Sequence, residues 1–117
     1  MRRVADAMRA PVVAVEPATT VQETSARMLD ADVHAAVVVQ DGTVCGMVTA
    51  ERLGDALGQG YDPTETPVGV VAEPDPLLVE AGETLAEAHE RMRAADRAVA
   101  PVVATDGSPV GLLEDST

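Results

Sequence analysis

Apolar and polar positions along the chain recur in two copies of one pattern. Each copy begins with apolar residues at helical spacing, continues as an apolar run of strand length, reverses at an Asp-Gly pair and returns as a second apolar run. Thr20 and Thr84, which begin the copies, are 64 residues apart, whereas Gly46 and Gly111 near their ends are 65 apart, so one residue is added near Thr105. The chain is therefore predicted to contain two copies of one unit. The helical positions are Val21, Thr24, Met28 and Ala31 in the first copy and Leu85, Ala88, Met92 and Ala95 in the second.

Local signals give each copy the order strand, helix, strand, strand, helix. Thr20 with Glu23, and Thr84 with Glu87, have the spacing of a capping box at the start of a helix. A final helix is predicted over residues 50–57, with Leu53 and Leu57 facing inward. No residues remain after the second copy to build the counterpart of this helix. The predicted strands cover residues 12–15, 35–39 and 44–48, then 77–79, 99–103 and 111–113, and short helical lead-ins cover residues 4–8 and 68–72.

This order predicts an α/β (α+β) fold of two pseudo-symmetric β-α-β-β-α repeats, the last helix of the second being truncated. Residues 1–60 form the first repeat, residues 61–67 the linker and residues 68–117 the second repeat. Repeats of this size are marginal alone, so we expect them to share one apolar core. Because the chain has no Phe, no Trp and one Tyr, that core is built from Val, Ala, Leu and Met.

Composition excludes several classes of function. A net charge of −12, with Arg as its only basic residue type, argues against a nucleic-acid partner, which requires a basic face. No apolar stretch is long enough to span a membrane, so we expect no membrane partner and a cytoplasmic protein. The absence of Lys beside abundant Ala, Val, Arg and Asp fits a GC-rich bacterial genome. Cys45 is the only cysteine and lies in a predicted strand, so an inert buried thiol is the favoured interpretation.

The duplicated pattern resembles a tandem pair of cystathionine-β-synthase (CBS) domains, also called a Bateman module. The residues that carry the resemblance are the lead-in at 4–8, Gly46 to Thr49 after the first hairpin turn, and Ala100 to Val103 before the second. The resemblance implies two repeats packed sheet against sheet around two clefts, pairing into a homodimer. It also implies a regulatory module that requires no cofactor and binds AMP, ADP, ATP or S-adenosylmethionine, acting on an unknown protein in trans.

The resemblance also indicates where such a ligand binds. Family members carry a Ser or Thr after the third strand and a ribose-binding Asp three residues later; here these positions hold Thr49 and Arg52. Arginine has no acceptor for ribose hydroxyls but can hold a phosphate. Glu51 beside it lies at a different helical azimuth. The alternative for Thr49 and Arg52 is a helix N-cap and a solvated helix residue. The first cleft is expected to include Val13 and Val37 as well.

In the second copy, Glu114 takes the position of Thr49, and Thr117 takes that of Arg52. An anion at Glu114 opposes a phosphate, so the second cleft, which is expected to include Pro101, is the weaker candidate.

Other candidates are weaker still. His34 and His89 are far apart in sequence and have no carboxylate at ligand spacing, so no metal site is predicted. Glu80, Glu83, Glu87 and Glu90 form an acidic run that is typical of a solvated face. No nucleophile with a base is apparent, and no enzyme is predicted. The sequence thus leaves two hypotheses: a sensor of adenosine-containing ligands, or a ligand-free dimerisation scaffold.

Overall fold

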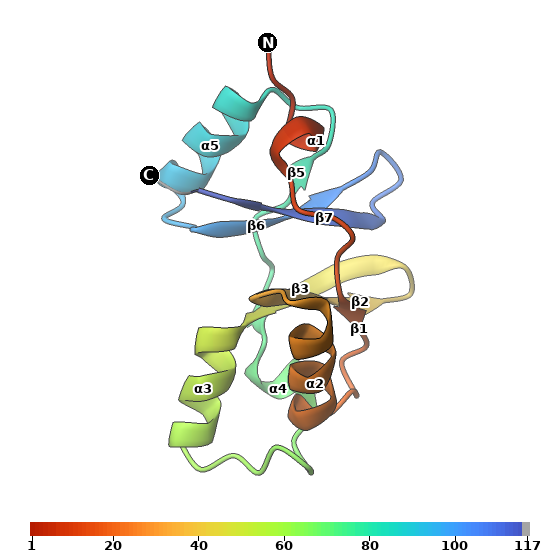
Figure 1. Cartoon of the computed structure of the whole chain (residues 1–117), viewed down its shortest axis with the longest axis vertical. Helices are drawn as coiled ribbons and strands as arrows, with labels where there is room; N and C mark the ends of the chain where they lie inside the picture. The colour runs from red at the N-terminus through yellow and green to blue at the C-terminus, as the bar shows by residue number, and fades with distance from the viewer. Residues whose placement is uncertain (116–117) are drawn as a thin grey trace. The chain divides into compact units, whose positions relative to one another are not determined.

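The chain forms an α+β fold with two β-sheets, as the sequence predicts, and the computed structural model describes residues 1–115 (Figure 1). Both copies of the pattern give the predicted order of a short strand, a helix and a hairpin. Among the described residues no helix is long and apolar enough to span a membrane. The elements are α1 (Val4–Ala7), β1 (Ala14–Val15), α2 (Val21–Ala31), β2 (Ala35–Gln40), β3 (Thr43–Thr49), α3 (Ala50–Gly58), α4 (Val68–Val71), β4 (Glu73–Pro74), β5 (Val79–Glu80), α5 (Leu85–Ala94), β6 (Val99–Val103) and β7 (Pro109–Glu114).

The elements gather into two compact units. The β1–β4 unit contains Val13–Asp75, and the β5–β7 unit contains Met1–Val12 together with Pro76–Thr117. The units therefore divide the chain differently from the sequence repeats. The lead-in helix α1 belongs to the unit built by the second copy, and α4 belongs to the unit built by the first.

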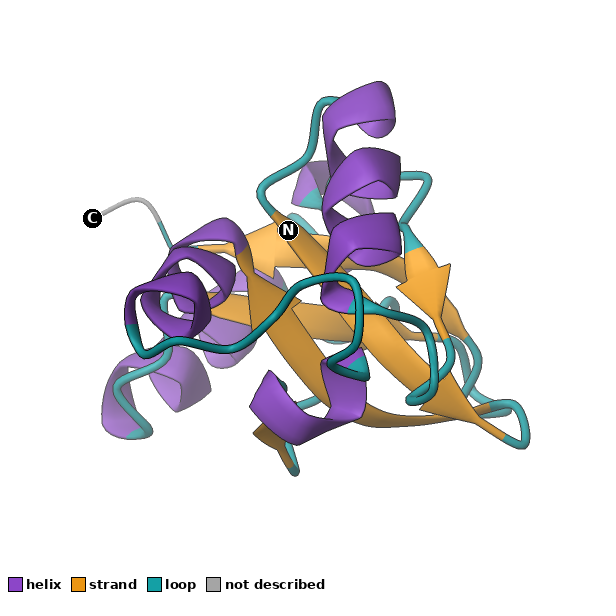
Figure 2. Ribbon diagram, turned by 90° about the horizontal axis from the view of Figure 1, so that it is seen from below, coloured by secondary structure: helices purple, strands orange, loops and turns teal. Residues whose placement is uncertain are grey.

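In the β1–β4 unit the sheet has the order β1-β2-β3-β4, with β1 parallel to β2 and the later pairs antiparallel. The helices α2, α3 and α4 lie on one face of this sheet (Figure 1; seen from the helix side in Figure 2). Strand β4, which the sequence did not predict, pairs with β3.

In the β5–β7 unit the order is β5-β6-β7, with β5 parallel to β6 and β6 antiparallel to β7. Figure 1 shows α1, from the start of the chain, beside α5 and β5. Arg9 pairs with Leu112 of β7 through two backbone hydrogen bonds of 2.8 and 3.0 Å. Arg9 is thus the counterpart of Glu73 in β4, which pairs with Met47 of β3.

The segment that follows each lead-in helix runs close beside a glycine of the strand with which it pairs. A Cβ placed on Gly111 would lie 2.7 Å from the carbonyl oxygen of Arg9, and one on Gly46 would lie 3.1 Å from that of Glu73. At Gly111 only glycine lets the two backbones approach so closely, whereas at Gly46 an added Cβ would require a shift of a few tenths of an ångström. Gly46 of the first copy therefore leaves room for the segment after the second lead-in, and Gly111 of the second copy leaves room for the segment after the first.

Each hairpin also contains a β-bulge just before this glycine. In the first copy Val38 pairs with Gly46 and Val39 with Val44, so Cys45 is the extra residue without a partner. Cys45 is exposed, so the prediction of a buried thiol is wrong. A periodic reading of the strand assigns alternate residues to the core, and the bulge breaks that alternation.

Each unit has a hydrophobic cluster of its own, and the core shared between the repeats stays a prediction. Each cluster nevertheless combines residues of both copies, since the lead-ins are exchanged. The first cluster contains Val15, Val21, Met28, Ala36, Val38, Val48, Leu53, Ala56, Val68 and Val71. The second contains Val4, Val79, Ala88, Met92, Ala100, Val102 and Leu113.

Helix caps and faces follow the prediction in part. Thr20 and Thr84 each accept a hydrogen bond from the backbone N–H three residues later, at 3.1 and 3.3 Å. Among residues 1–115 neither threonine N–H donates the reciprocal bond of the predicted box to the glutamate carboxylate. Leu53 is 4% exposed, whereas Leu57 is 50% exposed, so its inward assignment is wrong.

The added residue near Thr105 changes the second hairpin turn. Asp41 and Gly42 both have positive φ, which is typical of a tight type I′ turn, whereas in the second turn Gly107 has positive φ and Asp106 does not. Instead, the carboxylate of Asp106 accepts bonds of 2.7 and 3.0 Å from the hydroxyl and N–H of Ser108. These bonds lower the pKa of Asp106.

Candidate functional site

Thr49 lies where β3 meets α3. Its backbone pairs with Ala35 of β2, and its side-chain oxygen accepts a hydrogen bond of 3.1 Å from the N–H of Arg52, so it is the N-cap of α3. The sequence offered this cap as the structural alternative to ligand binding. A threonine hydroxyl that accepts one bond still has its O–H to donate. The cap and a contact with a ligand oxygen are therefore compatible.

Arg52 stands in the first turn of α3, and its Nε donates a hydrogen bond to the carbonyl oxygen of Val71 in α4. The two terminal nitrogens of the guanidinium have four further N–H groups. Arg52 is thus anchored through one nitrogen, and its planar end remains suited to a phosphate rather than to ribose hydroxyls.

Thr49 and Arg52 line the same hollow of about 180 Å³, together with Met47, Glu51, Asp55 and Glu73. Glu51 contributes to this hollow even though its helical azimuth differs from that of Arg52. Asp55, one turn further along α3, was missed by sequence reasoning, although its spacing of three residues from Arg52 is the signal that could have found it. The hollow therefore brings one cation together with three carboxylates.

Val13 and Val37 lie beside each other but do not line that hollow. The carbonyl oxygen of Val13 accepts a 2.9 Å hydrogen bond from the N–H of Val37, and Val37 is fully buried. Val13 packs against the helix-side cluster that also holds Ala36 and Val38. Because side chains alternate along a strand, Val37 points to the opposite face of β2.

In the second copy, Glu114 is the exposed last residue of β7 and pairs with Val99, while Pro101 is buried in β6 and pairs with Leu112. Thr117, which was predicted to replace Arg52, lies outside the described residues.

Asp115, next to Glu114, reaches Arg93 of α5 with its carboxylate at 3.4 Å. The carboxylate of Asp115 thus forms an ion pair with a side chain of α5.

The histidines do not form a joint site. His34 is exposed before β2, and its carbonyl oxygen accepts a 2.8 Å bond from the N–H of Ala50. His89 is half-buried in α5, and its Nε2 has no hydrogen-bond partner among the residues that the structure describes. Within residues 1–115 no three His, Cys, Asp or Glu side chains are grouped as a metal site requires.

The β1–β4 unit has further hollows that were not predicted, and two of them bear on function. The larger, of about 630 Å³, lies along the loop before α2 and includes Arg27 and the hairpin turn at Asp41 and Gly42. The other, of about 320 Å³, runs between α2 and α3 and contains the exposed apolar side chains of Leu29 and Leu57.

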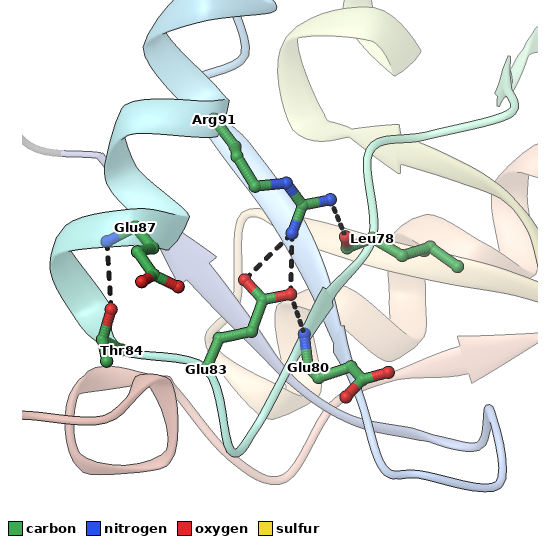
Figure 3. A network of polar contacts seen from close by, with 6 residues as sticks. All are labelled: Leu78, Glu80, Glu83, Thr84, Glu87 and Arg91. Carbon is green, nitrogen blue, oxygen red and sulfur yellow. Dashed lines mark hydrogen bonds and ion pairs between the residues drawn. The ribbon is translucent and has the colours of Figure 1, made fainter.

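The predicted acidic run in the β5–β7 unit is only partly a solvated face. Glu83 accepts two hydrogen bonds, of 2.7 and 2.9 Å, from the guanidinium of Arg91, which also donates a 3.1 Å bond to the carbonyl oxygen of Leu78 (Figure 3). Glu83 is thus held in an ion pair with Arg91 of α5.

Comparison with known proteins gives matches over both copies of the pattern. The CBS domain family profile matches residues 4–58 and 66–116. The structure of CBSX2 from Arabidopsis thaliana in complex with AMP is 25% identical, covers 97% of this chain and 90% of that chain, and has a TM-score of 0.76. The CBS domain protein PAE2072 from Pyrobaculum aerophilum, complexed with AMP, is 23% identical, with coverage of 96% and 86% and a TM-score of 0.84. The CBS domain pair of MJ0100, with 5′-methylthioadenosine and S-adenosyl-L-methionine, is 16% identical, with coverage of 97% and 90% and a TM-score of 0.84.

Proposed function

Because the chain belongs to the CBS domain family, we propose that it is a regulatory module that binds an adenosine-containing ligand and acts on a partner protein in trans. The observation that carries the proposal is the match of the family profile to both copies of the repeat. The AMP complex of the 25% identical CBSX2 supports adenosine as the ligand class.

The residues of the Thr49 hollow suit part of such a ligand. At about 180 Å³ it is smaller than most complete ligand sites, so it accommodates a phosphate or a ribose rather than a whole nucleotide. The terminal N–H groups of Arg52 and the O–H of Thr49 are donors for phosphate oxygens. Glu51 and Asp55 supply carboxylates that can accept hydrogen bonds from ribose hydroxyls, the role that Arg52 cannot fill.

The charges of the hollow set an order among the ligands. Three carboxylates face one guanidinium, so each added phosphate meets more repulsion than attraction. We therefore expect AMP or S-adenosylmethionine to bind more tightly than ATP.

Thermal unfolding with AMP, ATP, S-adenosylmethionine and, as a control, GMP tests the proposal. A ligand at a hundred times its dissociation constant should stabilise the protein by about 2.7 kcal/mol, which is a rise of several degrees in Tm. Asp55→Asn should reduce the rise, whereas Asp30→Asn, an exposed carboxylate of α2 outside the hollow, should not. If no adenosine ligand at millimolar concentration raises Tm, the sensor hypothesis is wrong.

The apolar groove between α2 and α3 favours a second candidate, a homodimerisation scaffold. Leu29 and Leu57, which line it, are 81% and 50% exposed, and exposed apolar patches of this kind often mark protein interfaces. Light scattering after size exclusion should give a dimer that Leu29→Asp converts to a monomer. A monomeric wild-type protein would contradict the homodimer, and a dimer without any ligand-induced rise in Tm would favour the scaffold over the sensor.

A further inference from the structure

An arginine occupies the same position in the main helix of both units. Arg27 lies in α2 and Arg91 in α5, each seven residues after the threonine that caps its helix. The turn before each cap is also the same. The N–H of Thr19 donates to the carbonyl oxygen of Glu16 at 3.0 Å, and that of Glu83 donates to Glu80 at 3.1 Å.

In the β5–β7 unit the guanidinium is neutralised by the protein itself. Both carboxylate oxygens of Glu83 accept bonds from one terminal nitrogen of Arg91, and the other terminal nitrogen donates to the carbonyl oxygen of Leu78 (Figure 3). Glu83 also accepts a 3.4 Å bond from the N–H of Glu80. The carboxylate of Glu83 is therefore held by a guanidinium and a backbone N–H.

In the β1–β4 unit the carboxylate is missing and the cation remains. Thr19 stands in the position of Glu83, and Ala14 in that of Leu78. Within the described part of the chain, Arg27 makes no hydrogen bond or ion pair. Thr19, Ala14 and Arg27 all line the hollow of about 630 Å³. The volume lies within the range of small-molecule sites.

We propose that this hollow binds a small molecule through its carboxylate group, which pairs with Arg27 in the place that Glu83 takes beside Arg91. The carboxylate would accept two bonds from the guanidinium and one from the N–H of Glu16, the counterpart of Glu80. None of the residues that line this hollow lines the Thr49 hollow, so the site goes beyond the proposed adenosine function.

The charges around the hollow select a singly charged ligand. Glu16 and Asp41 also line it, so one cation faces two carboxylates. A phosphate dianion meets more repulsion there than a carboxylate does. We therefore expect acetate, the simplest probe of the group, to bind more tightly than inorganic phosphate.

Nuclear magnetic resonance titration of the whole chain with sodium acetate, against sodium chloride at equal ionic strength, tests the site. The Nε–H signal of Arg27 and the backbone N–H signals of Glu16 and Thr19 should shift and saturate with acetate. Arg27→Gln should abolish the shifts at Glu16 and Thr19. Thr19→Glu should abolish them too, because its carboxylate would occupy the site, and it should move the Arg27 signal toward that of Arg91 before any acetate is added.

The second copy provides the matched control. In the wild-type protein the Arg91 signal should not respond to acetate, and in Glu83→Thr it should acquire a saturable response. The proposal is overturned if acetate shifts Arg27 no more than chloride does, if the response survives in Thr19→Glu, or if phosphate binds more tightly than acetate. Because Thr19 is a half-buried loop residue whose counterpart in the other unit is already the glutamate Glu83, the outcome of Thr19→Glu decides the matter even if Glu83→Thr does not fold.

Discussion

Replacing Gly111 with alanine should destabilise the β5–β7 unit strongly, because the new Cβ has no room. It would lie 2.7 Å from the carbonyl oxygen of Arg9 and 2.9 Å from the sulfur of Met8. The methionine side chain can move aside, but the oxygen belongs to a backbone that pairs with Leu112 through two hydrogen bonds. The substitution therefore forces the segment after α1 away from β7.

The cost can be worked out from these contacts. Each of the two backbone bonds contributes about 1 kcal/mol, and overpacking costs at least about 1 kcal/mol more. Gly111→Ala should thus lower the free energy of unfolding by about 3 kcal/mol. In Gly46→Ala the nearest oxygen, that of Glu73, is 3.1 Å away, so a shift of a few tenths of an ångström suffices and we expect about 1 kcal/mol.

Urea unfolding followed by circular dichroism measures these changes, with Gly54→Ala as the control. Gly54 lies inside α3 with nothing within 4 Å of an added Cβ, so its replacement should stabilise the helix by up to about 1 kcal/mol. Hydrogen exchange should also accelerate at the Arg9 and Leu112 amides in Gly111→Ala. Equal costs for Gly111→Ala and Gly46→Ala, or unchanged exchange at these amides, would refute the reasoning.

Three smaller perturbations test other parts of the structure. Thr49→Ala should lower the free energy of unfolding by about 1 kcal/mol in urea titrations because α3 loses its N-cap, and Thr49→Asn should restore most of it; equal stability of the two variants would contradict the cap. The pKa of Asp106 is lowered in the folded chain, so its bonds to Ser108 stabilise the fold at pH values above the ordinary pKa of 3.8, and this stabilisation is lost as the pH falls through the folded pKa. Ser108→Ala should raise the pKa of Asp106 in a carboxyl NMR titration and make the stability less sensitive to acid. An unchanged pKa would disprove this. Cys45, exposed at its bulge, should react with Ellman's reagent in the native protein, whereas reaction only after unfolding would show that the thiol is covered.

Periodicity and turn residues predicted most elements because they are local signals. The threonine caps, the Asp-Gly turn at 41–42 and the apolar runs of β2 and β6 each lie within a few residues of the element that they specify. Strand β4 could not be predicted in this way. It is two residues long, and it is defined by its partner Gly46, which is distant in sequence.

The candidate site was predictable only as far as single positions go. Thr49 and Arg52 were found because the resemblance fixes their place after β3, and the structure brings them to one hollow. The bond from Arg52 to Val71 could not be foreseen, since it depends on how α4 packs against α3. Arg27 was overlooked for a related reason: its significance appears only when the Glu83 ion pair of the other unit is seen.

The exchange of lead-in helices explains how half-size repeats can be stable in such an aromatic-poor chain. Val4 of the first lead-in is fully buried in the cluster of the second copy, and Val68 of the second lead-in is fully buried in the cluster of the first. Burying one such side chain contributes about 2 kcal/mol, a sizeable share of the stability of a domain this small. Because each unit takes a buried valine and a residue paired to its sheet from the opposite repeat, each unit is completed by the other copy of the sequence.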